Sequence, residues 1–537
     1  MAMKRITYRR TLTALALIST CGLLAAGCAS SAGSSDGTGA PKLVRAGVIG
    51  EQSDEGRAME SATLTYASHS LTNTLDPIKG RTSAWLGGTE MAAIYDVLVR
   101  WDPESAEIVP QLAESITEAP DRLSWTVRLR DGVTFSNGDT LDASAVIAST
   151  NRMTEGNATN SDQFRANVRS VEATDPSTVT YNLKNPWSDF PTLLTSGFGM
   201  ITHSDSFRDG KFVEPIGAGP FTVESVNPGF ELVLAPREDY WGGKPRIGEL
   251  KFVDLQGEQP MVDALKAGEV QMAYLRGGEA IDTMRADFPG YYEPVSMVDN
   301  GLLNIREGRA AHDIRVRQAI AKAIDPTVIN ERSRKGLNSP GLEMFQEWST
   351  MHGSIPGPTP DIEAARKLVD EAKADGYDGK LTFAALSDPA STDLALAMQS
   401  LLQNVGFEVE IQPNATKNDI AKVFYVTHDF DVSVAGTAVP DSAPLLRLQG
   451  LLTTGSSQNV SGYSNPTMDE VIFQIQTAGT EDERRAGFEK MQTILNEDVP
   501  ILPLGSGANF ITWAPNVHDA KSGMDGLTLF DKVWISD

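Results

Sequence analysis

Residues 381–411 read LTFAALSDPASTDLALAMQSLLQNVGFEVEI, and this stretch decides the fold class. Its first six residues form the short apolar run typical of a buried strand. Residues 393–405 follow a helical pattern that Gly406 ends, and residues 408–411 return to a strand pattern. Strand, helix and strand at this spacing predict a right-handed parallel crossover, and therefore an α/β fold.

The sequence around this unit predicts further helices. Val316, Ile320 and Ile324 share one face of a helix that Asp313 caps. Residues 361–374 form a second amphipathic helix. A third helical pattern, at 484–496, leads into the apolar run 500–504, which we expect to be a strand that returns to the first half of the fold.

The first half of the chain instead predicts antiparallel pairing. Alternating residues 125–130 precede Asp131-Gly132 and then residues 133–135, a pattern typical of a hairpin. Val179, Tyr181 and Leu183 alternate in another strand, and residues 221–225 and 230–234 flank a turn in a second hairpin. A mixed lobe therefore precedes an α/β lobe, and a cleft between two lobes is a favoured place for a ligand.

The first 27 residues differ in composition from the rest. A basic segment precedes an apolar run at 12–24, which is too short and wrongly flanked for a stable membrane span. The Gly27-Cys28 junction resembles a lipobox, in which cleavage leaves Cys28 as a diacylated N-terminus. Cys21 fits this pattern less well because Thr20 precedes it. We therefore expect a lipoprotein signal peptide at 1–27 and a flexible tether at 28–60, with plain secretion as the alternative.

Cysteine usage and charge exclude several classes of function. The chain's two cysteines are Cys21 and Cys28, so a processed, lipidated chain has no free thiol for a disulfide, a nucleophile or a metal site. Removal of the signal's four positive charges takes the net charge from −25 to −29. Such a surface repels nucleic acid and anionic lipid, so membrane attachment is expected through the lipid. The six histidines show no paired spacing, and we expect no metal site, cofactor or catalytic residue.

Six segments, taken in order, resemble the family 5 extracellular solute-binding proteins, whose members bind peptides, nickel complexes and some sugars. The segments are 108–115 (IVPQLAES), 125–138 (WTVRLRDGVTFSNG), 217–221 (GAGPF), 239–245 (DYWGGKP), 315–325 (RVRQAIAKAID) and 462–469 (GYSNPTMD). We expect the glycines of these segments to serve turns, and Tyr240 and Trp241 to plug a lobe rather than touch solute.

The resemblance implies a two-lobe α/β fold of the type II, class C periplasmic-binding-protein kind, with an extra subdomain in the first lobe and a hinge of crossing strands. The expected ranges are 61–95, 215–300 and 500–537 for the first lobe, 96–214 for its extra subdomain and 301–499 for the second lobe. It also implies a monomer on the extracytoplasmic face of the cell membrane that delivers solute to an ABC permease. The chain has no Walker A motif, so the cytoplasmic ATPase is expected to be another polypeptide.

The resemblance implies ligand contacts from loops at the cleft. The expected residues are Asn73, Leu75, Ser83, Trp85, Asn304, Trp348, Thr437, Ala438 and Asp441. Trp85 and Trp348 are candidate walls for side-chain pockets, and we expect Trp348→Ala to weaken binding more than it lowers stability.

Peptide-binding members pair an Asp of the 434–441 loop with the peptide's α-ammonium group. Ala438 stands at that position here, and Asp441 is a candidate substitute. A buried ammonium group without a counter-charge costs several kcal/mol. The solute therefore stays open between free peptides, capped or modified peptides, sugars and metal chelates.

Two other classes of function remain as alternatives. A ligand sensor or adhesin can use the same fold, since fold does not determine function. An extracytoplasmic hydrolase is the minor alternative, because the serine motif G-x-S-x-G at 33–37 lies in the flexible tether and lacks its strand-turn-helix context.

Overall fold

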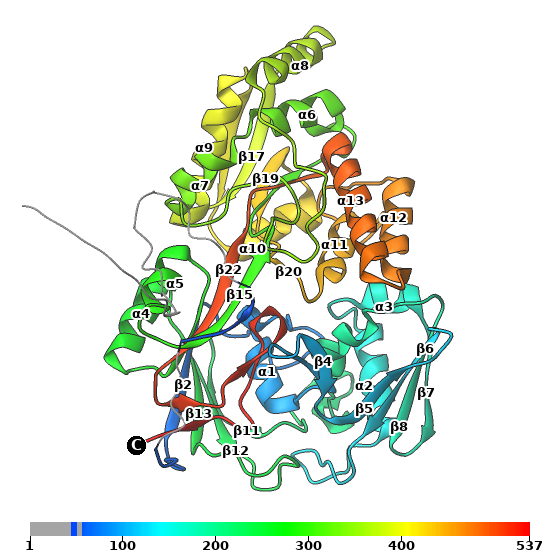
Figure 1. Ribbon diagram of the computed structural model, residues 1–537, viewed down its shortest axis with the longest axis vertical. Helices are drawn as coiled ribbons and strands as arrows, with labels where there is room; N and C mark the ends of the chain where they lie inside the picture. Colours follow the sequence, from blue (N-terminus) through cyan, green and yellow to red (C-terminus); the bar gives the residue numbers. More distant parts are fainter. Residues whose placement is uncertain (1–44, 51–55) are drawn as a thin grey trace, which may run out of the picture. The chain divides into compact units, whose positions relative to one another are not determined.

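The computed structural model describes residues 45–50 and 56–537. The expected signal peptide, Cys28 and most of the expected tether lie outside the described residues. Two large sheets dominate the described part, one in each lobe (Figure 1).

The first lobe is built on a nine-stranded sheet in the order β1-β15-β22-β14-β2-β13-β12-β11, with β20 also paired to β15. The strands are β1 Gly47–Ile49, β2 Thr63–Ser68, β11 Phe221–Asn227, β12 Glu231–Pro236, β13 Glu249–Asp254, β14 Met272–Leu275, β15 Gly290–Ser296, β20 Val439–Pro440 and β22 Gly507–Trp513. Strands β11 and β12 form the second hairpin predicted from the sequence, antiparallel across the turn that follows Asn227.

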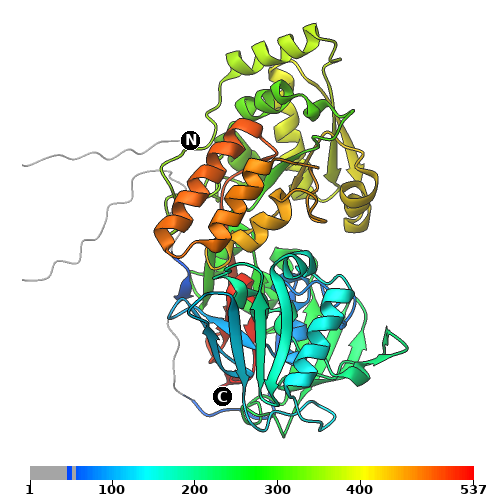
Figure 2. The same cartoon turned by 90° about the vertical axis from the view of Figure 1, so that its right-hand side faces the viewer.

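Helices cover both faces of this sheet. Helix α1 (Gly88–Tyr95) packs into one hydrophobic core, while α4 (Glu258–Ala267) and α5 (Gly278–Met284) pack into the core on the other face. The last residues of the chain fold back onto the first lobe, where Figure 2 marks the C-terminus. Phe530 and Val533 are fully buried in the same core as α1. The short strand pairs are β9 Phe207–Arg208 with β10 Lys211–Phe212, β23 Val517–His518 with β26 Trp534–Ile535, and β24 Lys521–Ser522 with β25 Thr528–Leu529.

The extra subdomain of the first lobe has its own sheet and core. Its antiparallel sheet has the order β5-β6-β8-β7, and the remaining two strands, β3 and β4, pair with each other. The bounds are β3 Val99–Asp102, β4 Glu107–Pro110, β5 Ala113–Glu118, β6 Ser124–Leu129, β7 Val168–Asp175, β8 Thr178–Leu183, α2 Ala143–Glu155 and α3 Ser161–Asn167. In β8 the alternating Val179, Tyr181 and Leu183 are all buried, as predicted.

The hairpin predicted across Asp131-Gly132 is wrong. Strand β6 pairs with β5 on one edge and β8 on the other, so no edge is free for residues 133–135. After the turn, Thr134 instead bridges Thr140, and Val133 and Phe135 point into the subdomain core.

Tyr240 and Trp241 anchor the subdomain to the first lobe, in agreement with their predicted structural role. Both donate hydrogen bonds to the buried carboxyl of Asp96, at 2.7 Å and 3.2 Å. Burial raises the pKa of Asp96 to about 7.

The second lobe carries a five-stranded sheet in the order β18-β17-β19-β16-β21. Strands β17 and β18 are parallel and are joined by α9, which confirms the predicted crossover. Helix α9 begins at Pro389, four residues earlier than predicted, because Asp388 accepts a hydrogen bond from the Ser391 amide and caps the helix. The strands are β16 Asn300–Leu303, β17 Lys380–Leu386, β18 Glu408–Asn414, β19 Val432–Ala435 and β21 Ile501–Pro503.

The other predicted helices of this lobe are confirmed. Asp313 caps α6 and Asp361 caps α8, each by accepting a hydrogen bond from a backbone amide of the first turn. The helices are α6 Ile314–Ala323, α7 Pro326–Arg334, α8 Ile362–Ala374, α9 Pro389–Asn404, α10 Lys417–Lys422, α11 Pro444–Leu452, α12 Pro466–Thr477 and α13 Glu481–Asp498. Hydrophobic cores cover both faces of the five-stranded sheet.

Three segments cross between the two sheets and form the hinge. Residues 297–299 join β15 to β16, residues 436–438 join β19 to β20, and residues 504–506 join β21 to β22. Strands β15 and β22 run side by side through the first-lobe sheet (Figure 1). The predicted hinge of crossing strands is confirmed, but the strand predicted at 500–504 pairs with β16 in the second lobe, and it is β22 that returns to the first. The residue bounds predicted for the lobes stay a prediction.

Candidate ligand-binding site

A cavity of about 480 Å³ lies between the lobes and is lined from both. This volume falls within the range of small-molecule sites, about 300–1,000 Å³. The first lobe contributes residues 78–84 and 524–527, and its subdomain contributes residues 157–165. The second lobe contributes the start of α11 and its preceding loop, Tyr425, and residues 457–458.

Uncharged polar side chains are the largest group in the cavity lining, beside charged and apolar ones. They include Thr82, Ser83, Asn157, Thr159, Asn160, Ser161, Gln163, Thr192, Thr195, Ser196, Ser457 and Gln458. Such groups donate and accept hydrogen bonds without a fixed charge, so they suit a solute rich in carbonyl, amide or hydroxyl groups.

Two carboxylates line the cavity, and both already have partners. Asp162 accepts hydrogen bonds from Arg165 at 2.5 Å and from the Ser457 hydroxyl at 2.6 Å. The Ser457 hydrogen bond is the largest cause of the lowered pKa of Asp162. Asp525 accepts a 2.6 Å hydrogen bond from Arg447 of α11. Both carboxylates are thus paired with an arginine of the protein itself.

The subdomain contacts the second lobe beside the cavity. Arg484 of α13 binds both carboxylate oxygens of Asp189, and both side chains are largely buried. Arg122 donates to the carbonyl oxygens that end α12, and Gln476 donates to Asn167 at 2.9 Å. In Figure 1, α12 and α13 stand next to α3 at this junction. Together with the Ser457–Asp162 bond, these contacts hold the lobes around the cavity.

The structure divides the predicted first-lobe loop between two places. Ser83 lines the interlobe cavity, and the side chain of Trp85 lies outside the part of the structure that is described. Asn73 and Leu75 line a second hollow of about 270 Å³ that lies within the first lobe. Glu90 also borders this hollow, and its burial raises its pKa to about 7.

Three predicted residues lie at the hinge. The Trp348 indole donates to the Ser506 hydroxyl at 3.2 Å, between β21 and β22. Thr437 accepts a 2.7 Å hydrogen bond from Asn300, and Ala438 adopts the left-handed backbone conformation with φ of 49°. None of the three borders the interlobe cavity as the described residues define it.

The two remaining predicted residues are engaged inside the second lobe. Asn304 is completely buried and donates to the carbonyl oxygens of His428 and Phe430. Asp441 accepts hydrogen bonds from Ser349 at 2.6 Å and from the Thr350 amide at 2.7 Å. Its carboxylate therefore stabilises the 349–350 turn, and it does not border the cavity.

Sequence reasoning missed most of the cavity wall. The second-lobe wall includes Arg447 and Gln458, and the first-lobe wall includes the subdomain segment 157–163 and Asp525. The only local signal is the polar run NATNSDQ at 157–163, which is typical of a loop but says nothing about what the loop faces. These residues meet only because the lobes fold against each other.

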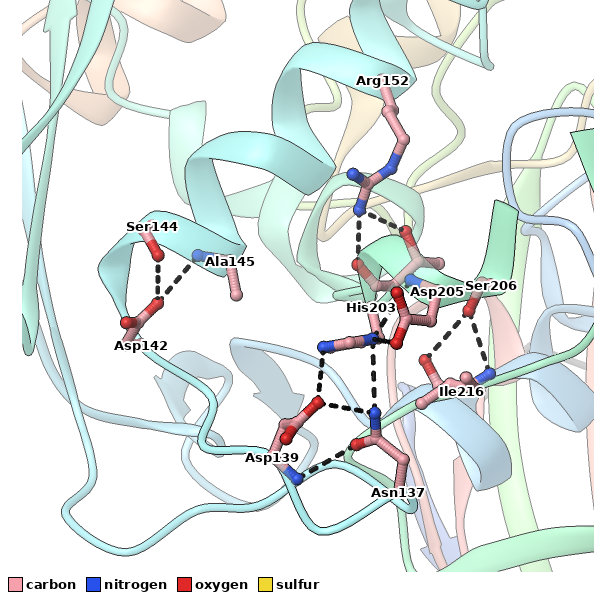
Figure 3. Close-up of polar contacts among 11 residues, drawn as sticks. Asn137, Asp139, Asp142, Ser144, Ala145, Arg152, His203, Asp205, Ser206 and Ile216 are labelled. Atoms are coloured by element: carbon pink, nitrogen blue, oxygen red, sulfur yellow. Dashed lines mark hydrogen bonds and ion pairs between the residues drawn. The ribbon is translucent and has the colours of Figure 1, made fainter. Parts of the chain in front are cut away.

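A histidine with two carboxylates lies in the subdomain (Figure 3), and none of the three residues lines the interlobe cavity. His203, Asp139 and Asp205 each place one potential ligand atom within 4.8 Å of the others. The Asp205 amide donates to His203 Nδ1 at 3.1 Å, and His203 Nε2 faces the Asp139 carboxylate at 3.2 Å. Hydrogen bonds therefore use both ring nitrogens, and the cluster is explained as a cap on the turn at 204–206.

No helix within residues 45–50 and 56–537 is both long enough and apolar enough to span a membrane. Residues 107–459 match the model of the family described as bacterial extracellular solute-binding proteins, family 5 Middle.

Curated relatives and solved structures resemble most of the chain. Di/tripeptide-binding protein 2 of Pseudomonas aeruginosa (strain UCBPP-PA14) is 26% identical over 509 residues, which cover 88% of this chain and 94% of the relative. The glutathione-binding protein GsiB of Escherichia coli (strain K12) is 24% identical over 458 residues, which cover 80% of this chain and 86% of the relative.

The fold is shared with DppA, an ABC transporter-associated periplasmic binding protein of Helicobacter pylori solved in complex with the peptide STSA. The TM-score is 0.77 at 21% sequence identity, over 89% of this chain and 98% of that chain. Since the family match covers more than half of the sequence, the chain belongs to the family 5 bacterial extracellular solute-binding proteins.

Proposed function

We propose that this protein is the solute-binding component of an ABC import system, that it encloses a small peptide-like solute between its lobes, and that it delivers this solute to a membrane permease. The observation that carries the proposal is the cavity of about 480 Å³, lined by many hydroxyl and amide groups, between two lobes that three segments join. The names of relatives that bind di/tripeptides and glutathione support a peptide-like solute.

The geometry suits capture and release. The hinge allows one lobe to turn against the other, and the Arg484–Asp189 pair forms across the mouth only where the lobes meet. The solute replaces its lost water contacts with the hydroxyl and amide groups of the wall. The protein changes no covalent bond, because its role is to raise the local concentration of solute at the permease.

Titration calorimetry of the purified mature chain tests the proposal. We expect at least one dipeptide or tripeptide of a chemically varied panel to bind with a Kd near 1 μM, or about −8 kcal/mol. Binding is expected to raise the melting temperature, and small-angle scattering is expected to show a smaller radius of gyration. Turnover of a peptide, or no binding by any member of the panel, would contradict the proposal.

Transport and sensing differ in what deletion does to the cell. Loss of peptide uptake in a deletion strain supports delivery to a permease. Intact uptake combined with a lost transcriptional response supports a sensor instead.

Cys28 is proposed to carry the lipid that holds the monomeric protein on the extracytoplasmic face of the membrane. We expect Cys28→Ser to abolish incorporation of labelled fatty acid and to release the protein into the medium or the soluble envelope fraction. Cys21→Ser is the matched control, because it removes the chain's other cysteine from inside the expected signal. Labelling that survives Cys28→Ser and is lost in the control would place the anchor elsewhere.

A further inference from the structure

We propose that the solute is an anion whose carboxylate or phosphate group binds Lys79 and Arg81, and that its binding does not depend on a free α-ammonium group. This inference rests on the proposed function and names the chemical class of the solute.

The charge of the cavity is opposite to that of the chain. Among the described residues that line it, four side chains are cationic and two are anionic. The whole chain carries a formal net charge of −25. A strongly acidic protein repels anionic solutes at long range, so a cationic patch inside its ligand cavity is the feature that attracts them locally.

Neither anion of the wall is available to a ligand cation. Asp162 is neutralised by Arg165 and hydrogen-bonded to Ser457, and Asp525 is neutralised by Arg447. Asp441, the sequence-based candidate for an ammonium partner, is committed to Ser349 and Thr350. An incoming ammonium group therefore meets no unpaired carboxylate along the described wall and gains no ion pair in exchange for its lost hydration.

The two remaining cations are available. Lys79 and Arg81 are exposed, and within residues 45–50 and 56–537 neither forms a hydrogen bond or an ion pair with another side chain. The anion near Lys79 is Asp76, which is buried and accepts a hydrogen bond from the Ile78 amide. Burial raises the pKa of Asp76 and the Lys79 charge opposes that rise, but the two groups form no ion pair.

The chemistry of the two side chains defines what they recognise. A guanidinium group presents parallel N–H donors that match the two oxygens of a carboxylate or phosphate, and an ammonium group adds a point charge. One residue, the buried Gly80, separates the exposed Lys79 from the exposed Arg81, and all three line the cavity. The neighbouring Thr82 and Ser83 hydroxyl groups line the same wall and can donate further hydrogen bonds to an oxyanion.

A matched set of peptides tests the two halves of the inference by calorimetry. The probes are Ala-Ala-Ala, its N-acetylated form, its C-amidated form, and an N-acetylated, C-amidated tripeptide with a central phosphoserine. We expect N-acetylation to change the Kd by less than about threefold and C-amidation to raise it by at least about tenfold. The phosphopeptide separates the two oxyanions: binding stronger than that of the acetylated peptide assigns the site to phosphate, and weaker binding assigns it to carboxylate.

The opposite pattern overturns the inference and leaves the proposed function intact. That pattern is strong binding of the C-amidated peptide together with a large loss on N-acetylation. Absence of binding by all four probes overturns the proposed function as well.

The double variant Lys79→Gln/Arg81→Gln tests the residues. We expect it to weaken binding of the best anionic probe at least about tenfold and to leave the C-amidated peptide unaffected. Lys211→Gln/Lys266→Gln is the matched control, because it removes the same charge from two exposed lysines outside the cavity. Lys79→Arg is expected to retain binding, since it keeps the positive charge. Equal losses in the double variant and the control would show that only the overall charge matters and would overturn the assignment.

Discussion

The hinge and the cavity wall contain similar residue types but use them differently. At the hinge, Asn300 binds Thr437 and Ser506 binds both Trp348 and Gln346, so polar side chains satisfy one another. At the wall, Lys79 and Arg81 are exposed to the cavity and have no such partner among the described residues. Polar groups that are satisfied internally stabilise a joint, while polar groups left without partners are available to a ligand.

The largest effect is expected from a buried acid in a first-lobe strand that leads to the hinge. Glu293 lies in β15, accepts hydrogen bonds from Asn509 and the Asp525 amide, and has its pKa raised to about 8 by burial. Because the folded-state pKa lies above the unfolded value, this group's stabilising contribution is complete below the ordinary glutamate pKa and is lost as the pH rises through 8.

We therefore expect Glu293→Gln to raise the free energy of unfolding at pH 8.5 by about 2–4 kcal/mol relative to wild type, and by little at pH 4. The Asn509 side-chain oxygen has no partner among the described residues, so a flipped amide can accept the new N–H group. Calorimetric unfolding at both pH values measures this, with the exposed Glu224→Gln as control. A gain of the same size at both pH values would contradict the ionisation argument.

A second prediction concerns the Arg484–Asp189 contact between the lobes beside the cavity. Arg484→Ala removes the pair with Asp189 across the two lobes and is expected to weaken solute binding about tenfold, or about 1.4 kcal/mol. The reason is that the contact stabilises the closed state and not the isolated lobes.

Arg485→Ala is a close control, since Arg485 is the next residue of α13 and pairs with Asp482 of the same helix. Calorimetry with one peptide compares the two variants. Similar affinities in both would show that the Asp189 pair does not contribute to closure.

The smallest effect is expected at Trp348, for which the structure leads to a different prediction from the sequence. Because its indole binds Ser506 of the hinge and does not border the cavity, Trp348→Phe is expected to cost about 1 kcal/mol of stability. The Kd for solute is expected to stay within about twofold. Denaturant unfolding measures the stability, and calorimetry measures the Kd. A large loss of affinity with unchanged stability would show that Trp348 contacts the solute.

Local patterns were sufficient for several elements of the second lobe. The crossover of β17, α9 and β18 and the caps at Asp313 and Asp361 depend on neighbouring residues, so periodicity and capping chemistry predicted them. The hairpin at Asp131-Gly132 failed because a turn does not say whether the edge of β6 is already occupied by a remote strand.

The candidate site was less predictable for the same reason. Ser83 lines the cavity, but the 434–441 loop crosses the hinge, and Asn73 and Leu75 border another hollow. Arg447 and Asp525 are 78 residues apart in the chain and form an ion pair at the cavity. No local sequence pattern predicts such a contact.

The sequence by itself determined several helices and strands, the family resemblance and the expectation of two lobes, because these follow from residue types and their spacing along the chain. Only the tertiary structure decided which polar residues are satisfied and which face the cavity. That distinction depends on partners that come from the other lobe. An Asp or Arg that has such a partner is a structural residue, whereas one without a partner is available to bind a ligand.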